Sequence, residues 1–267
     1  MKFDITGSIA EALRFSLHHV VPFYLLGLVA GLPAYLHSFL QQEARTLDLP
    51  GGGREIFLPR PWWETDLAVP AIEAVLFGIM AAIMVHMRQR DRRGEPGTVL
   101  AGLADAAPCL PTVAAVSLTI MLAEALMTVG GTFLGEFIGT VGFILFLPLL
   151  ALLFFLYLVF CVALPSAAVD NAGVINAFRR SAALTAGSRG RLFGLFVILL
   201  LPLMVVIAAV VMLFRDVIFS GGFPALELWL IGAALVVYFN ALIVVIHEAL
   251  VALNEGAGAG TLATVFD

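Results

Sequence analysis

Six long apolar runs dominate the pattern of hydrophobic and polar positions along the chain. Each is about 20 residues or longer, the length at which an α-helix crosses a hydrocarbon core of about 30 Å. Because the runs are apolar on every face and do not alternate, they predict helices and not the strands of a barrel. We expect an all-α integral membrane protein with about six transmembrane helices. The runs are Val20–Leu40, Leu67–Met87, Pro111–Gly130, Phe137–Leu164, Leu192–Phe214 and Pro224–Leu253.

Short amphipathic segments precede the first, third and fifth runs. Each can form a helix that lies flat at the membrane surface, with its apolar stripe toward the lipid. In the first segment, Ser8 and Glu11 have the spacing of a capping box, which predicts a helix start at Ser8. The apolar positions are Ile5, Ile9, Leu13 and Leu17 in the first segment, Val99, Leu103, Ala107 and Leu110 in the second, and Val174, Phe178 and Ala182 in the third.

These segments also suggest an internal repeat. Residues 9–16 align with residues 174–181, and Gly7 and Leu13 correspond to Gly97 and Leu103. The repeat units are residues 4–88, 96–165 and 171–253, each with a cytoplasmic interfacial helix, an outward crossing, a loop and a return crossing. Three parallel units predict a pseudo-threefold bundle, followed by a flexible tail at residues 254–267. Alternatively, the similarity is one that any junction between a polar and an apolar segment would show.

Composition and charge support the membrane assignment and give it an orientation. Only 12% of residues are charged, against about a quarter in soluble domains, and the mean hydropathy is +1.05. The net charge of −5 argues against a nucleic-acid partner. Ten of the 14 basic residues lie in the N-terminal segment and in the linkers after the second and fourth runs. The positive-inside rule therefore places both termini in the cytoplasm. We expect the chain to lie in a bacterial inner membrane.

Polar residues within or near the runs are the candidate site. A charge at bilayer depth costs at least about 2.5–3.5 kcal/mol, so each needs an explanation. One interpretation is an outward-facing acidic vestibule for a cation, a proton or a polar headgroup. The other is that the carboxyl groups are hydrated or protonated, and that the amide bonds a neighbouring helix. The candidates are Glu73, Glu124, Glu227, Tyr238 and Asn240.

Four arginines at the predicted cytoplasmic face are candidate contacts for anionic lipid headgroups, each contributing about 1 kcal/mol. They are Arg179, Arg180, Arg189 and Arg191.

Catalytic and metal-binding motifs are missing from the sequence. His247 and Glu248 begin a zincin pattern, but Val251 stands where the second histidine ligand is required. Cys109 and Cys161 belong to no paired or clustered pattern, so we interpret them as packing residues. We expect no catalytic residue, no metal and no cofactor.

Three segments around residues 163–195 carry a resemblance to a known family. Residues 163–170 place a proline at the end of a crossing before an acidic turn, residues 177–181 read Ala-Phe-Arg-Arg-Ser, and residues 189–195 form a basic step into the next crossing. This pattern resembles the membrane domain fused to some glycerophosphodiester phosphodiesterases, and its free-standing YciC-like relatives. The resemblance implies a six-span layout. It does not imply the phosphodiesterase activity, because that needs a barrel of about 250 further residues.

Function is therefore a choice between two main hypotheses, with an intramembrane enzyme as a less favoured third. The leading hypothesis is a non-enzymatic scaffold or lipid-interacting module in envelope or membrane homeostasis. Its partners would be membrane lipids, through their anionic headgroups, and either a membrane protein or a second copy of the chain. The alternative is a small transporter or channel for an ion or polar lipid-related solute, with Glu124 and Asn240 along the path.

Overall fold

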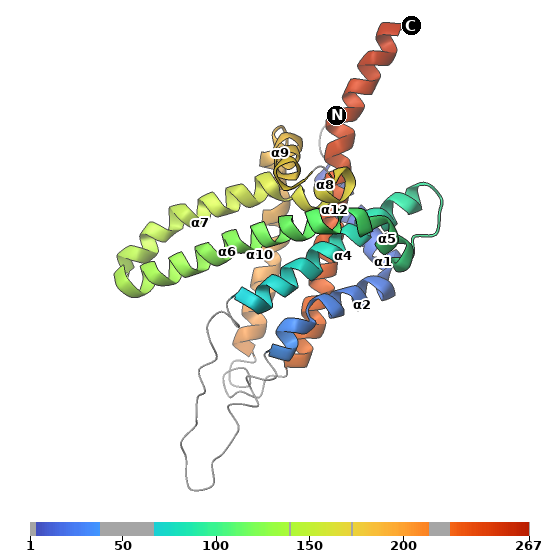
Figure 1. The fold of residues 1–267 in the computed structure, drawn as a ribbon. Coiled ribbons are helices and arrows are strands. Elements are labelled where there is room, and N and C mark those ends of the chain that lie inside the picture. Colours follow the sequence, from blue (N-terminus) through green and yellow to red (C-terminus); the bar gives the residue numbers. More distant parts are fainter. Residues whose placement is uncertain (1–3, 38–66, 139, 172, 214–224, 267) are drawn as a thin grey trace.

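The computed structural model describes residues 4–37, 67–138, 140–171, 173–213 and 225–266, and all regular structure in these ranges is helical (Figure 1). The predicted all-α class is therefore confirmed. The elements are α1 (Ile5–His18), α2 (Val20–Ala30), α4 (Val69–Arg92), α5 (Val99–Ala106), η2 (Ala107–Cys109), α6 (Leu110–Ile138), α7 (Thr140–Phe160), α8 (Ala163–Asp170), α9 (Val174–Thr185), α10 (Arg189–Leu213) and α12 (Ala225–Phe266).

The long helices are of the kind that crosses a membrane. Four helices in the described ranges are long and apolar enough to do so, and the number rises to six if each of two bent helix pairs counts as one span. Every predicted run overlaps one long helix or bent pair. The structure thus fits a multi-pass membrane protein, as the apolar runs predict. The four helices are Val69–Arg92, Val99–Gly131, Leu147–Asp170 and Trp229–Gly256.

Two of the three short amphipathic helices turn sharply away from the crossing that follows. Helices α1 and α2 meet at 90°, and α9 and α10 meet at 91°. The first bend lies at His19, whose backbone leaves the helical region at φ −110° and ψ 29°. Helix α5, by contrast, continues through η2 into α6 as part of one long helix. Only the first and third amphipathic helices are therefore separated from the following long helix by a right-angle bend.

The predicted capping box at the start of α1 is wrong. The helix begins at Ile5, so Ser8 lies inside it, and the Ser8 hydroxyl donates to the Asp4 carbonyl oxygen at 2.8 Å. This bond to a carbonyl four residues back is a common alternative for serine within a helix. Glu11 is consequently free of any capping role, and its carboxylate pairs with another helix instead.

Helix α1 packs through small residues and leaves its leucines outside. Ala12 and Ser16 are buried on the face that contacts α12, and small side chains permit this close approach of two helices. Leu13 and Leu17 remain 48% and 60% exposed. Part of the predicted apolar stripe is therefore available to lipid and not used in the protein core.

The buried core lies toward one end of the bundle, where the short helices α1, α5, α8 and α9 gather (Figure 1). On α4 it includes residues 80–87 except the partly exposed His86, whereas on α10 it includes Leu192, Leu195 and Phe196 near the helix start. Away from this end, α6 and α7 form a long hairpin (Figure 1), and apolar side chains on both helices are exposed. These exposed residues include Leu122, Leu126, Leu150 and Leu152.

The glycine- and alanine-rich segment 254–267 continues α12 as helix as far as Phe266. Figure 1 shows the C-terminal part of α12 projecting beyond the rest of the bundle. Its alanine and leucine residues favour helix, and the segment contains no proline that would end it. The expected flexibility of this tail stays a prediction.

Candidate functional site

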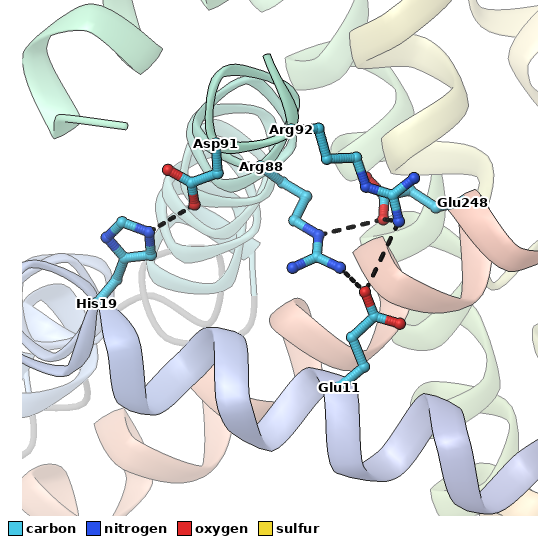
Figure 2. Close-up of polar contacts among 6 residues, drawn as sticks. All are labelled: Glu11, His19, Arg88, Asp91, Arg92 and Glu248. Carbon is cyan, nitrogen blue, oxygen red and sulfur yellow. Dashed lines mark hydrogen bonds and ion pairs between the residues drawn. The ribbon is translucent and has the colours of Figure 1, made fainter. Parts of the chain in front are cut away.

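Four charged side chains from three helices form a compact cluster at the core end of the bundle (Figure 2). Arg88 of α4 donates to Glu11 of α1 through Nη2 and to Glu248 of α12 through Nε, the latter at 3.2 Å. Arg92 Nη2 lies 2.8 Å from Glu248 Oε2 and 3.7 Å from Glu11 Oε1. We call Glu11, Arg88, Arg92 and Glu248 the charge clasp, and the end of the bundle that carries it the charged end.

Local helix geometry explains how the charge clasp assembles. Arg88 and Arg92 are four residues apart on α4, so their side chains project from the same face. That face meets Glu11 in the middle of α1 on one side and Glu248 of α12 on the other (Figure 2). The two arginines and two glutamates carry no net charge together. The positive charges of the arginines therefore offset the repulsion between the two nearby carboxylates.

Arg88 is the central member of the charge clasp. Its side chain is 13% exposed, and its guanidinium lies over the Phe15 ring with 5.0 Å to the centroid. A buried ion pair adds little net stability compared with apolar packing, but removing one partner leaves a costly buried charge. The charge clasp therefore fixes how α1, α4 and α12 meet more than it raises the total stability.

A second contact ties the α1–α2 bend to α4. His19 Nε2 lies 2.8 Å from Asp91 Oδ2, one of the interactions drawn in Figure 2. The His19 ring is buried against Phe15 and Phe23, with centroids 5.4 Å and 5.2 Å away. The imidazole thus joins the bend to the basic end of α4 and also fills space between aromatic rings.

Two further arginines form ion pairs at the charged end. Arg90 Nε lies 2.6 Å from Asp105 Oδ2 of α5. Arg180 of α9 lies 2.7 Å from both Asp170 of α8 and Glu255 of α12. The short helices are therefore fastened to the long ones by charge pairs, in addition to the buried small residues.

The candidate polar residues of the runs lie apart in the structure. Glu73 lines a cavity of about 280 Å³ together with Tyr35 and Trp229, whose rings are stacked at 4.8 Å. Glu124 is exposed on α6. Neither Glu124 nor Asn240 lines that cavity.

Helix α12 carries the other three candidates of this group. Asn240 donates to the Val236 carbonyl of its own helix at 2.9 Å. Tyr238 is half-buried beside Phe239. The side chain of Glu227 lies outside the described residues.

The four arginines expected at lipid headgroups differ in their surroundings. Arg180 is occupied by Asp170 and Glu255, as described above. Arg189 donates to the Ala182 carbonyl at 3.4 Å and lies over the Phe155 ring. Arg179 is exposed and Arg191 is half-exposed. The headgroup role stays a prediction for all four.

The sequence interpretation did not identify the charge clasp. Glu11 was assigned to a capping box, and Glu248 was considered only as part of a zincin pattern. The available signal was the pair Arg88 and Arg92 at the end of a long apolar helix, where each needs an anionic partner. Among the residues that the structure describes, no group of three or more His, Cys, Asp or Glu side chains could hold a metal ion.

Together, the long apolar helices and the paired charges at one end are typical of an all-helical membrane protein. Comparison of the chain with family models, with curated proteins and with solved structures finds no match.

Proposed function

We propose that this chain is a non-enzymatic, lipid-interacting module of a membrane, acting in membrane or envelope homeostasis. One observation carries the proposal. At the charged end, arginines of α4 and α9 form ion pairs with carboxylates of neighbouring helices, whereas the described parts of α6, α7 and α10 present exposed apolar side chains. Such a surface suits contact with lipid or with another membrane helix. Multi-pass insertion in a bacterial inner membrane, with both termini cytoplasmic, belongs to the same proposal and rests on the distribution of arginines.

A pseudo-threefold arrangement is part of this proposal, and the helix packing supports it. Each interfacial helix lies against the return crossing of the preceding unit: α5 against α4, α9 against α7 and α8, and α1 against α12. The outward crossings follow the same order, with α6 against α4, α10 against α7 and α2 against α12. The contact of α1 with α12 closes the ring between the first and last units.

Buried small residues at equivalent positions give the repeat further support. The alignment of the three interfacial helices matches Ala12 with Gly102 and Ala177, and all three are buried. One turn later it matches Ser16 with Ala106 and Ser181, which are buried too. At these positions a small side chain permits close helix packing.

Kinship with the membrane domain of glycerophosphodiester phosphodiesterases and the YciC-like proteins remains a proposal. It rests on the motif residues between 163 and 195. Within them, Asp170 and Arg180 form an ion pair, so two charged positions of the motif have a structural role in this chain.

The alternative of a transporter or channel has less support. A path through Glu124 and Asn240 requires both to line a common polar space. Glu124 is exposed on α6, and the Asn240 amide donates within its own helix.

Lipid dependence of stability tests the proposed function. Purified protein would be placed in nanodiscs with or without anionic phosphatidylglycerol, and its thermal unfolding compared. We expect anionic lipid to raise the unfolding midpoint. The double variant Arg179→Gln/Arg191→Gln should lose about 2 kcal/mol of this preference, at about 1 kcal/mol for each charge. Arg54→Gln is the matched control, because Arg54 lies in the long loop that we expect between the first two apolar runs, on the opposite side of the membrane. A midpoint that is the same in all lipids would contradict the proposal.

A further inference from the structure

A second cavity lies beside the charge clasp, at the charged end. Its volume is about 300 Å³, at the lower end of the range of about 300–1,000 Å³ for ligand pockets. Valine side chains from α4, α8 and α12 form much of its wall. Its polar lining comes from three helices and consists of Gln89, Arg92, Arg180, His247, Glu248 and Glu255. We call it the His247 cavity.

His247 is the residue in this cavity that most needs a partner. The residue is 4% exposed, and its Nε2 has no hydrogen-bond partner among the described residues. Buried polar atoms are nearly always hydrogen-bonded, and leaving one unsatisfied costs about 1–3 kcal/mol. A ligand with a hydrogen-bonding group in the cavity would remove this penalty.

The charges around the cavity limit what such a ligand can be. Arg92 lies 2.8 Å from Glu248, and Arg180 lies 2.7 Å from Glu255, so the lining is balanced before any ligand enters. A ligand with net charge would upset that balance. A zwitterion can instead place its phosphate oxygens at the guanidinium groups, whose geometry matches that of a phosphate, and its ammonium group at the carboxylates.

The position of the cavity indicates where the ligand comes from. The side chains of Arg92 and Glu255 are 57% and 53% exposed, so one side of the lining reaches the surface of the charged end. Val85 and Val244 lie toward the apolar parts of α4 and α12, before the charged residues of the lining in each helix. A lipid headgroup, with a charged part and a glycerol backbone that leads into lipid, matches this combination.

We propose that the His247 cavity binds the phosphoethanolamine headgroup of a zwitterionic phospholipid. The phosphate lies at Arg92 and Arg180, the ammonium group lies at Glu248 and Glu255, and His247 Nε2 forms a hydrogen bond with the headgroup. This inference rests on the proposed lipid-interacting function and names the lipid class for it.

Binding to the full chain in detergent tests the inference directly. Titrations would use lysophosphatidylethanolamine, lysophosphatidylglycerol, free phosphoethanolamine and inorganic phosphate, with bound ligand counted by native mass spectrometry. His247→Leu removes the buried nitrogen. Ala252→Phe fills the cavity from an exposed position, so it remains informative if His247→Leu fails to fold. Ala234→Phe, also exposed on α12 and outside the cavity lining, is the matched control.

We expect the ethanolamine lipid to bind at least tenfold more tightly than the glycerol lipid. Ala252→Phe and His247→Leu should each weaken that binding at least tenfold, and Ala234→Phe should leave it unchanged. Equal binding of the two lipids, or binding unaffected by the cavity variants, would overturn the inference. Competition by inorganic phosphate as strong as that by free phosphoethanolamine would assign a simple phosphate site instead. If the ethanolamine lipid shows no preferential binding but anionic lipid still raises the unfolding midpoint, only this inference is wrong. If stability does not depend on lipid at all, the proposed function is wrong as well.

Discussion

At the scale of single residues, the charges of this protein are important mainly through their partners. Arg88 lies between two carboxylates from different helices and over an aromatic ring. Glu124, in contrast, is an exposed carboxyl group on an apolar helix. Removing the charge of Arg88 should therefore destabilise the protein, and removing that of Glu124 should stabilise it.

Arg88→Met should lower the free energy of unfolding by about 2 kcal/mol, because Glu11 and Glu248 lose their central partner while Arg92 still compensates part of their charge. Chemical unfolding in detergent measures this. The double variant Arg88→Met/Glu248→Gln should recover part of the loss, since it leaves Arg92 with one carboxylate to compensate instead of two. Arg93→Met, at an exposed position of the same helix end, is the control. Equal effects of Arg88→Met and Arg93→Met would show that the charge clasp has no special role.

Glu124→Leu should make the protein more stable in a bilayer, by about 2 kcal/mol, because an exposed carboxyl group at bilayer depth is unfavourable. Thermal unfolding in nanodiscs provides the measurement. Glu124→Gln in proteoliposomes gives the functional comparison: a lipid-interacting scaffold is indifferent to it, whereas a transporter that uses this residue loses flux. Loss of stability in Glu124→Leu, or solute uptake that depends on Glu124, would favour the transport alternative.

At the scale of elements, the short helices connect the long ones through small buried residues. Ala12 of α1 is fully buried, and its aligned residue Ala177 of α9 is 4% exposed. The exposed leucines of α1 lie on another face. The interhelical approach is therefore sensitive to side-chain size at a few positions only.

Ala12→Leu should reduce stability by about 2 kcal/mol, since overpacking a tight helix contact typically costs about 1–3 kcal/mol. Ala177→Leu should have a similar effect if the two helices are equivalent units of one repeat. Ala10→Leu, on an exposed position of α1, should change the unfolding midpoint little. Thermal unfolding in detergent compares all three. Tolerance of leucine at residue 12 but not at residue 10 would contradict the assigned packing face.

The long helices could be predicted from the sequence, and the charge clasp could not. The composition of an apolar run is enough to predict a long helix in an apolar environment. Every predicted crossing accordingly overlaps a long helix or bent pair in the structure. The charge clasp instead joins residues 11, 88 and 248, and no local pattern indicates which charges meet over such separations. Glu11 illustrates the difference, because its spacing from Ser8 suggested a capping role that the longer α1 removes.

At the scale of the whole molecule, ion pairs and buried core residues gather at one end. Long helices extend away from this end (Figure 1). This asymmetry is expected of a protein whose charged end lies at one membrane surface and whose long helices are surrounded by lipid. Most of its exterior would then face hydrocarbon instead of water. This arrangement requires the charged end to lie on one side of the membrane and the loop that contains Arg54 to lie on the other.

Thiol labelling in intact cells and inverted vesicles measures this most directly. The buried Cys109 and Cys161 would first be replaced by alanine. Single cysteines would then be introduced by Gly187→Cys, at the exposed turn between α9 and α10, and by Arg54→Cys in the long loop. We predict that an impermeant reagent labels residue 187 only from the cytoplasmic side and residue 54 only from the opposite side. Labelling of both positions from the same side would contradict the account.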